Sequence, residues 1–219
     1  MAMCDANYCF TLVDVGNYGK DNDAHIFNES DIGKAFHAKQ MNIPSPTEVD
    51  KHYLPYVIVS DEIFGLRRWL MKPYPGKGLD EQQAVFNYRL SHCRRTIENC
   101  FGILSARWHI FRRPIRAAPE TVDGIVKACL CLHNYLQLTE NAQYIPTGFI
   151  DSEDSSGNIN PGDWRSIVQD EEGVLKRTHT GRAFNRSSHK AKDIRDNFKN
   201  YFNSKNGSLP WQKSHVNSC

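Results

Sequence analysis

The feature of this chain that most constrains its fold is a long apolar stripe between residues 80 and 108. Steps of three and four residues place its members on one face of an α-helix. We therefore predict a long helix that begins at Leu79 or Asp80 and buries this face. The members of the stripe are Phe86, Leu90, Cys93, Ile97, Phe101, Leu104 and Trp108.

A short apolar segment before this helix has the character of a buried strand. Residues 57–59 are all apolar and β-branched, which is typical of a strand covered on both faces of a sheet. Asp61 follows this segment, so we expect its carboxylate at the carboxyl end of the strand. Open α/β sheets bind ligands at that edge. An ordinary loop aspartate explains the same pattern equally well.

The remaining segments alternate between strands and helices. This order predicts a mixed α/β fold, with helices packed on a sheet. The predicted elements are a hairpin over residues 1–15 with its turn at 5–7, a helix from Asn22 or Asp23 to about Ala38, a loop over 42–48, a short helix over 65–71, and helices over 119–138 and 191–202.

The charge of the chain is unevenly distributed, although the formal net charge is only +2. Residues 65–118 hold 11 Lys or Arg against 3 Asp or Glu, and residues 176–213 hold 10 against 2. Between them, residues 140–173 carry 8 acids and 1 Arg. The basic segments are candidate surfaces for a phosphate backbone. A solvated helix face and a soluble tail explain them equally well.

Composition also predicts the location of the protein and its division into domains. No apolar run reaches the roughly 18–20 residues that a membrane helix needs, and no signal-peptide pattern opens the chain. The 7 cysteines lie inside apolar patterns, which indicates reduced thiols and an intracellular protein. We expect an α/β domain over residues 1–139, an acidic and then basic flexible linker over 140–190, and a C-terminal helix and tail over 191–219.

Three acids are candidates for a metal site. Asp61 is expected at the strand end, and Glu98 lies on the long helix beside its apolar stripe, with 36 residues between them. Asp23 opens the first predicted helix. Carboxylates on separate rigid elements can hold Mg²⁺ against a phosphate. The alternatives are a helix cap for Asp23 and a surface ion pair between Arg94 and Glu98.

A cysteine–histidine pattern and two tryptophans are weaker candidates for a binding site. Cys131 points away from the helix face that Cys129 and His133 share, so buried thiols explain this pattern better than a structural zinc site. Trp69 and Trp108 are predicted to be packing residues. An aromatic side chain beside a basic patch can also stack on a nucleobase.

Several segments together resemble the PIF/Harbinger transposases and their domesticated nuclease-like relatives. The most specific part is the pattern RxxIENxFGxLxxRW, which begins at Arg94 and ends at Trp108. The His133-Asn134 pair belongs to another matching segment, and a packing role explains it at least as well as a catalytic one. The resembling segments are residues 5–36, 56–115, 126–136 and 191–212.

The resemblance implies an RNase H-like fold, with a mixed sheet flanked by helices, and a DDE set of catalytic acids. Asp61 would be the second catalytic acid and Glu98 the third, while Asp23 would be a further metal-binding acid. The implied ion is Mg²⁺ or Mn²⁺, and the implied reaction takes place at DNA phosphodiester bonds. The arginines expected to contact DNA are Arg94, Arg95, Arg107, Arg112 and Arg113.

The chain also departs from the family pattern. The family's first catalytic aspartate lies on the first strand, in a motif resembling DGTH, and no such motif occurs here. Neither Asp5 nor Asp14 occupies that position. The sequence is therefore expected to begin inside the second strand, so the first strand is missing and the catalytic site is incomplete. Whether the chain is an enzyme stays open at this point.

Two alternatives to a nuclease or transposase domain follow from this departure. One is a non-catalytic, transposase-derived nuclear protein that binds DNA or another protein, and the other is a non-functional gene fragment. The expected partners are DNA and a separate Myb-like or helix-turn-helix DNA-binding protein, with no membrane. The expected location is the nucleus, with the cytoplasm second.

Overall fold

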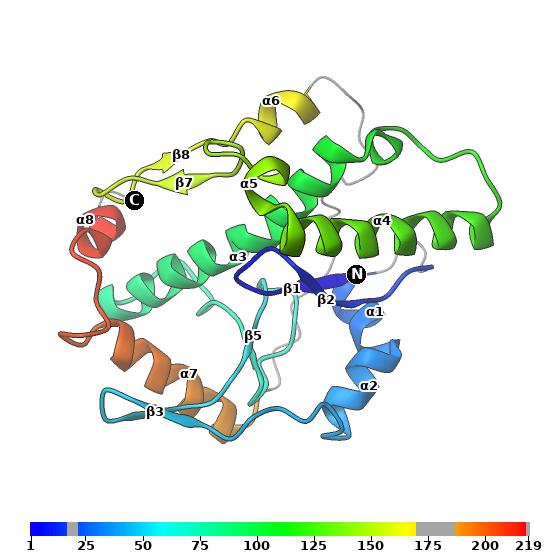
Figure 1. Cartoon of the computed structure of the whole chain (residues 1–219). Coiled ribbons are helices and arrows are strands. Elements are labelled where there is room, and N and C mark those ends of the chain that lie inside the picture. Colours follow the sequence, from blue (N-terminus) through cyan, green and yellow to red (C-terminus); the bar gives the residue numbers. More distant parts are fainter. Residues whose placement is uncertain (17–21, 170–186, 218–219) are drawn as a thin grey trace. The chain divides into compact units, whose positions relative to one another are not determined.

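The structure is a computed structural model that describes residues 1–16, 22–169 and 187–217. Helices and small sheets alternate along the chain, which confirms the predicted mixed α/β class (Figure 1). Within these described residues each sheet has two strands. No helix in this part of the chain has both the length and the apolar character needed to cross a membrane.

The chain divides into two compact units. Unit one combines residues 1–21 with 95–179, and unit two combines residues 22–94 with 180–219. The predicted long helix is confirmed as α3 (Glu81–Arg107), a helix of 27 residues that contributes to both units.

Unit one begins with the predicted hairpin of β1 (Ala2–Cys4) and β2 (Phe10–Val13), which pair in antiparallel register. The Asp5 carboxylate closes the turn, because its Oδ1 accepts hydrogen bonds from the backbone N–H groups of Asn7 at 2.9 Å and Cys9 at 3.0 Å. Asp5 is therefore a turn residue, as its short hydrogen-bonding side chain favours.

The edge of β2 is covered by a side chain of α4 (Pro119–Thr139), the helix predicted over residues 119–138. Asn134 Oδ1 accepts from the backbone N–H of Phe10 at 2.8 Å, and Asn134 Nδ2 donates to the Phe10 carbonyl at 2.8 Å. This amide satisfies both backbone groups of an edge strand as a neighbouring strand would. Asn134 thus has a structural role, because it links the hairpin to α4.

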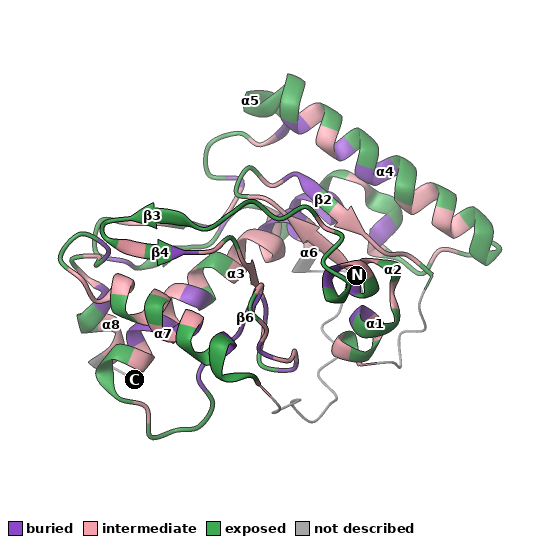
Figure 2. Cartoon of the chain, turned by 90° about the horizontal axis from the view of Figure 1, so that it is seen from below, coloured by how far each residue is buried: buried purple, intermediate pink, exposed green. Residues whose placement is uncertain are grey.

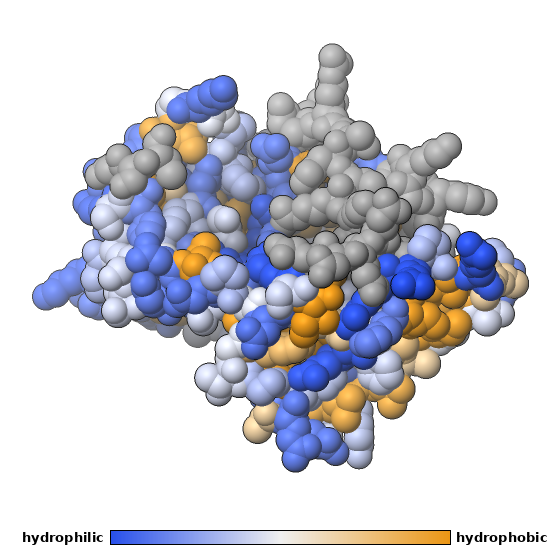
Figure 3. All heavy atoms as spheres, turned by 90° about the horizontal axis from the view of Figure 1, so that it is seen from above, coloured by the Kyte–Doolittle hydropathy of each residue, from blue (hydrophilic) through white to orange (hydrophobic). Residues whose placement is uncertain are grey.

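The helix α4 buries one face against β2 and leaves the other exposed (Figure 2). Cys129 and His133 lie at the centre of the buried face. Leu132 of the same helix is 45% exposed. Figure 3, seen from above, shows hydrophobic and hydrophilic side chains side by side at the lower right of the view.

In unit one, α3 is buried on two opposite sides. Cys100 and Leu104 pack against Phe10 of the hairpin and against α4. Ile103 packs with residues further along the chain, including Tyr144, so the second side is covered as well. The single stripe predicted from the sequence therefore accounts for only part of the burial of this helix.

The second side of α3 is covered by residues that composition predicted to be a linker. The described part of that range holds α5 (Asn141–Tyr144), β7 (Ser152–Glu153), β8 (Ile159–Asn160) and α6 (Trp164–Gln169). Gly102 makes this packing possible, because a Cβ at that position would lie 2.3 Å from Trp164 Cδ2.

One acid of this segment, Asp151, is buried and paired within the segment. Asp151 has no exposed side-chain surface, and its carboxylate accepts from Arg165 at 2.8 and 2.5 Å and from the Gly162 N–H at 2.9 Å. Burial opposes the charge of Asp151, but these hydrogen bonds and the nearby charge of Arg95 outweigh it and lower its pKa.

Unit two begins with two short helices where one was predicted, α1 (Asp23–Glu29) and α2 (Asp31–His37). Ser30 separates them, with an extended backbone at ψ 154° and a side chain that caps α2 by accepting from the Gly33 N–H at 3.0 Å. The helices pack so closely that a Cβ at position 33 would lie 1.8 Å from the Phe27 carbonyl oxygen.

Two small sheets complete this part of unit two. The hairpin of β3 (Thr47–Val49) and β4 (His52–Leu54) overlaps the predicted loop, and its turn places two consecutive non-glycine residues at positive φ. The predicted strand is confirmed as β5 (Ile58–Val59), which pairs in parallel with β6 (Leu70–Met71). The helix predicted over residues 65–71 is wrong, because these residues form β6 and the loop before it.

The tail helix is confirmed as α7 (His189–Phe202) and is followed by α8 (Gln212–Asn217). Ala191 of α7 is fully buried in the core of unit two. The helix predicted over residues 191–202 therefore packs into this core. The buried members of this core are Leu66, Met71, Tyr74, Phe86, Leu90 and Ala191.

The amide of Asn134 gives a first test of the fold. We expect Asn134→Ala to lower the free energy of unfolding by about 2 kcal/mol, because it leaves two backbone groups of Phe10 without partners. Urea unfolding followed by circular dichroism measures this. Thr139→Ala removes an exposed hydroxyl from the same helix, and should change stability by less than about 0.5 kcal/mol. Equal effects of the two substitutions would contradict the role of Asn134.

Candidate functional site

The carboxyl ends of β5 and β6 bring charged side chains to one edge of a parallel pair. Ile58 pairs with Leu70 and Val59 with Met71, so both strands end at the same level. Asp61 follows β5 closely, and Lys72 directly follows β6. Since parallel strands of α/β proteins bind ligands at this edge, it is the candidate functional site of unit two.

The carboxylate of Asp61 is fixed in orientation. Its Oδ1 accepts from the backbone N–H of Ile63 at 3.1 Å, which is an Asx turn. Its Oδ2 lies 3.9 Å from Arg94 Nη2, and the Asp61 side chain is 20% exposed. The predicted strand-end position is confirmed, and the structure adds Arg94 as an ionic partner of Asp61.

Lys72 is buried beside this carboxylate, with 5% of its surface exposed. Its Nζ donates to the Glu62 carbonyl at 2.9 Å and so holds the loop that follows Asp61. Burial and then the charge of Arg195 lower the pKa of Lys72, while Glu62 and Asp61 oppose this shift. The site therefore contains a cation within electrostatic range of its acid.

A second buried cation comes from α7. Arg195 is 9% exposed and stacks 3.8 Å above the Tyr74 ring, and its Nη1 donates to the Pro73 carbonyl at 3.3 Å. Among the described residues its Nε has no hydrogen-bond partner. Tyr74 donates to Asp196, and burial followed by this contact raises the pKa of the phenol, so it stays protonated.

The other two predicted metal ligands lie elsewhere. Asp23 is the exposed first residue of α1, and Asn22 rather than Asp23 caps this helix by accepting from the Ala24 N–H at 2.8 Å. Glu98 is a partly exposed residue of α3 in unit one, whereas Asp23 and Asp61 belong to unit two. Across the described parts of both units, no group of three or more His, Cys, Asp or Glu could hold a metal ion.

The groups around Asp61 can be compared with the ligands that a divalent ion prefers. Carboxylate oxygens are the ligands that Mg²⁺ and Mn²⁺ prefer. Asp61 fits in kind, because Arg94 stands beyond hydrogen-bond distance from its Oδ2. Arg94 and Lys72, however, place positive charge beside it. The described residues thus supply the right donor type without an assembled ligand group.

Several of the predicted DNA-binding arginines also serve the fold. Arg112 donates to the carbonyls of Ser105 at 3.1 Å and Ala106 at 2.6 Å, and so caps the end of α3. Arg107 donates to the Tyr144 carbonyl at 2.9 Å. Arg94 pairs with Asp61, Arg95 lies near Asp151, and Arg113 is exposed. Their contact with DNA stays a prediction.

His133 lies at the centre of a buried polar network in unit one and is fully buried. Its Nε2 lies 2.8 Å from the Tyr8 carbonyl, so this nitrogen carries the proton. Its Nδ1 accepts from the Tyr144 hydroxyl at 2.9 Å, and that oxygen accepts from Trp108 Nε1 at 3.2 Å. Both ring nitrogens are thus engaged in the fold, while Cys131 is exposed.

Comparison with known proteins gives the family context of this geometry. Residues 1–134 match the family described as "DDE superfamily endonuclease". "Protein ALP1-like" of Arabidopsis thaliana is 27% identical over 142 residues, which cover 62% of this chain and 34% of that protein. The chain therefore spans about a third of the length of this curated relative. No solved structure matches the chain.

The buried imidazole predicts how stability depends on pH. Burial lowers the pKa of His133 and outweighs its hydrogen bond to Tyr8. The stabilising effect of a neutral His133 is then complete above the unfolded pKa of about 6.5 and is lost as the pH falls through the lowered folded value. Within this window the slope reaches at most about 1.4 kcal/mol per pH unit.

This dependence is measured by urea unfolding at neutral and at mildly acidic pH. We expect the wild type to lose stability as the pH falls below about 6.5, and His133→Gln to lose less over the same interval. His25→Gln replaces an exposed histidine of unit two and should behave like the wild type. Identical pH profiles for His133→Gln and the wild type would refute the assignment.

Proposed function

The chain belongs to the DDE superfamily endonuclease family, and from this we propose that it is a Harbinger-type nuclease domain that acts on DNA phosphodiester bonds. The observation that carries the proposal is the family match over residues 1–134, which include Asp61 and Glu98. The position of Asp61 at the carboxyl end of a parallel strand supports it. Residues 1–139 would form this nuclease domain.

An RNase H-like fold is part of the proposal. The antiparallel hairpin β1–β2 and the parallel pair β5–β6 are the kinds of strand pair that a mixed sheet combines. Helix α3 would carry the third acid, Glu98, as the family pattern requires.

We propose that Asp23, Asp61 and Glu98 bind Mg²⁺ or Mn²⁺. A bound ion would stabilise the charge that develops at a phosphodiester. The Ile63 N–H would orient Asp61, and Lys72 would hold the loop beside it. Since the family's first aspartate is not found among the 219 residues, we expect these residues alone to bind the ion weakly and to cleave DNA poorly.

The partners and the location of the protein are proposals of the same kind. We propose DNA as the substrate, held by the arginines of α3 and of the segment after it, and a separate Myb-like or helix-turn-helix protein as the source of sequence-specific binding. A protein that acts on chromosomal DNA would work in the nucleus.

A second candidate function is a non-catalytic protein that binds DNA or another protein. The observation that favours it is the positive charge of Arg94 and Lys72 beside Asp61, which already compensates the carboxylate without an ion. Binding to DNA would then persist in EDTA and weaken steeply with salt. Binding and cleavage that both require the ion would instead favour the nuclease.

Calorimetric titration with Mn²⁺ tests the proposed acids. We expect the double variant Asp61→Ala/Glu98→Ala to bind Mn²⁺ at least about tenfold more weakly than the wild type, because it loses two carboxylate ligands. Asp163→Asn, which changes an exposed acid outside the proposed set, should bind as the wild type does. Equal affinities of the double variant and the wild type would disprove the assignment of these acids.

A further inference from the structure

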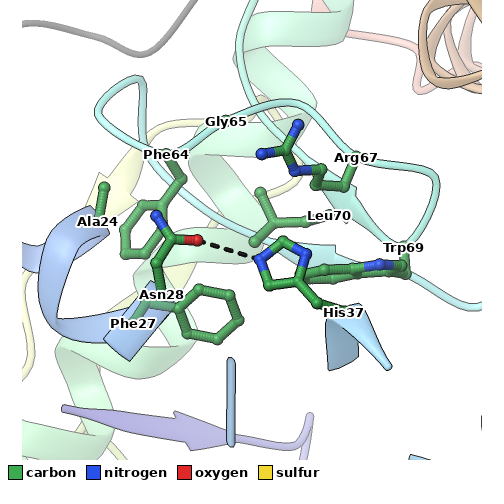
Figure 4. Close-up of a pocket in the computed structure, with 9 residues that line it drawn as sticks. All are labelled: Ala24, Phe27, Asn28, His37, Phe64, Gly65, Arg67, Trp69 and Leu70. Carbon is green, nitrogen blue, oxygen red and sulfur yellow. Dashed lines mark hydrogen bonds between the residues drawn. The ribbon is translucent and has the colours of Figure 1, made fainter. Parts of the chain in front are cut away.

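A hollow in unit two lies between α1, α2 and the connection from β5 to β6 (Figure 4). It consists of an enclosed part and a more open part, which share His37, Arg67 and Trp69. Asn28 lines the enclosed part, while Lys39 and Arg68 line the open part. These six residues define what we call the Trp69 pocket.

One wall of the Trp69 pocket is a fixed aromatic surface. The Trp69 ring stacks on Phe36 with centroids 4.8 Å apart and an interplanar angle of 27°. Phe27 packs against the same ring at 5.8 Å, and His37 meets it edge-on at 5.5 Å and 75°. The indole is therefore held in one orientation, as a platform for a planar ligand must be.

The rest of the pocket is cationic. Arg67 and Arg68 come from the loop before Trp69, and Lys39 follows α2. Among the described residues that line the pocket there is no Asp or Glu. Burial and then the charge of Arg67 lower the pKa of His37. The site is therefore suited to an anion rather than to a metal cation.

The polar end of the enclosed part adds a hydrogen-bonding group. Asn28 Oδ1 lies 3.1 Å from His37 Nε2, which fixes the amide at the rim of the aromatic wall. This part of the hollow has a volume of only about 10 Å³, room for roughly one water molecule, so a larger ligand would lie in the open part. The open part, with a volume of about 420 Å³, thus combines two features: an aromatic wall and a cluster of cations.

We propose that the Trp69 pocket binds one unpaired nucleotide of DNA, with its base against Trp69 and its phosphate between Lys39, Arg67 and Arg68. An aromatic platform beside a basic groove is the combination that holds single-stranded DNA. A base inside a duplex cannot reach such a wall without leaving its stack. This inference rests on the proposed function as a DNA-acting protein and names the strand state that it recognises.

The connection from β5 to β6 supports this placement. Asp61 lies near its start and Trp69 at its end, so one loop carries both the candidate acid and the stacking residue. An exclusively structural Trp69 would account for the contacts with Phe27 and Phe36, but not for the three cations gathered around it.

The proposal is tested by fluorescence anisotropy, with a blunt DNA duplex and the same duplex carrying a short single-stranded overhang as probes. All titrations contain EDTA, so that no metal-dependent step contributes. We expect the wild type to bind the overhang probe about tenfold more tightly than the blunt one, since each stacked base adds this much. Trp69→Leu should remove the preference and leave binding of the blunt probe intact, whereas Trp69→Phe should keep most of it.

A matched pair of charge variants separates the pocket from the general basic surface. Arg68→Gln and Lys205→Gln each remove one exposed cation of unit two, inside and outside the pocket respectively. We expect Arg68→Gln to weaken binding of the overhang probe severalfold more than Lys205→Gln does, because only Arg68 would contact the bound phosphate.

Three outcomes would overturn the proposal. These are equal binding of both probes by the wild type, an equal loss for both probes in folded Trp69→Leu, and indistinguishable effects of Arg68→Gln and Lys205→Gln. If circular dichroism shows that Trp69→Leu does not fold, Trp69→Phe and Arg68→Gln decide the question. An overhang preference without any metal-dependent cleavage would leave the pocket in place and reject the nuclease activity alone.

Discussion

The burial of α3 on two opposite sides is the constraint on which unit one depends. Residues 100–104 of α3 face both the β1–β2 hairpin and the segment after residue 140. The side chains must therefore fit closely on both sides of the helix. Gly102 lets Trp164 approach, and Asn99 Oδ1 accepts from Trp164 Nε1 at 2.9 Å. Asn99 and Gly102 lie in the most specific part of the family pattern. This part of the pattern therefore has a packing role, besides any chemical role of Glu98.

Local sequence patterns were enough to predict the elements that have a clear pattern of their own. The helices α3, α4 and α7 and the turn of the first hairpin were predicted because each signal lies within a short stretch of sequence. The break at Ser30 and the strand β6 were missed for a different reason. The strand β6 exists only through its pairing with β5, and no periodicity over two residues reveals such a partner.

The candidate site was predictable only in part. The apolar run before Asp61 was enough to place this acid at the end of a strand. The buried cations of this region were not predicted. Lys72 interacts with Asp61, and Arg195 interacts with Lys72, but each resembles an ordinary basic residue in the sequence. What unites them is burial, at 5% and 9% exposure, which only the folded chain shows. The sequence therefore identifies the acid, whereas the charged groups near it become known only from the folded structure.

The connection between β5 and β6 carries both the candidate acid Asp61 and the proposed stacking residue Trp69. Parallel strands are usually joined by a dozen or more residues, commonly with a helix, whereas here residues 60–69 suffice. Such a loop has little freedom, and three contacts restrain it further: Ile63 to Asp61, Lys72 to Glu62, and the bridge between Arg67 and Leu70. Restraint of this kind preorganises both the carboxylate and the aromatic wall, so little conformational entropy is lost when a ligand binds.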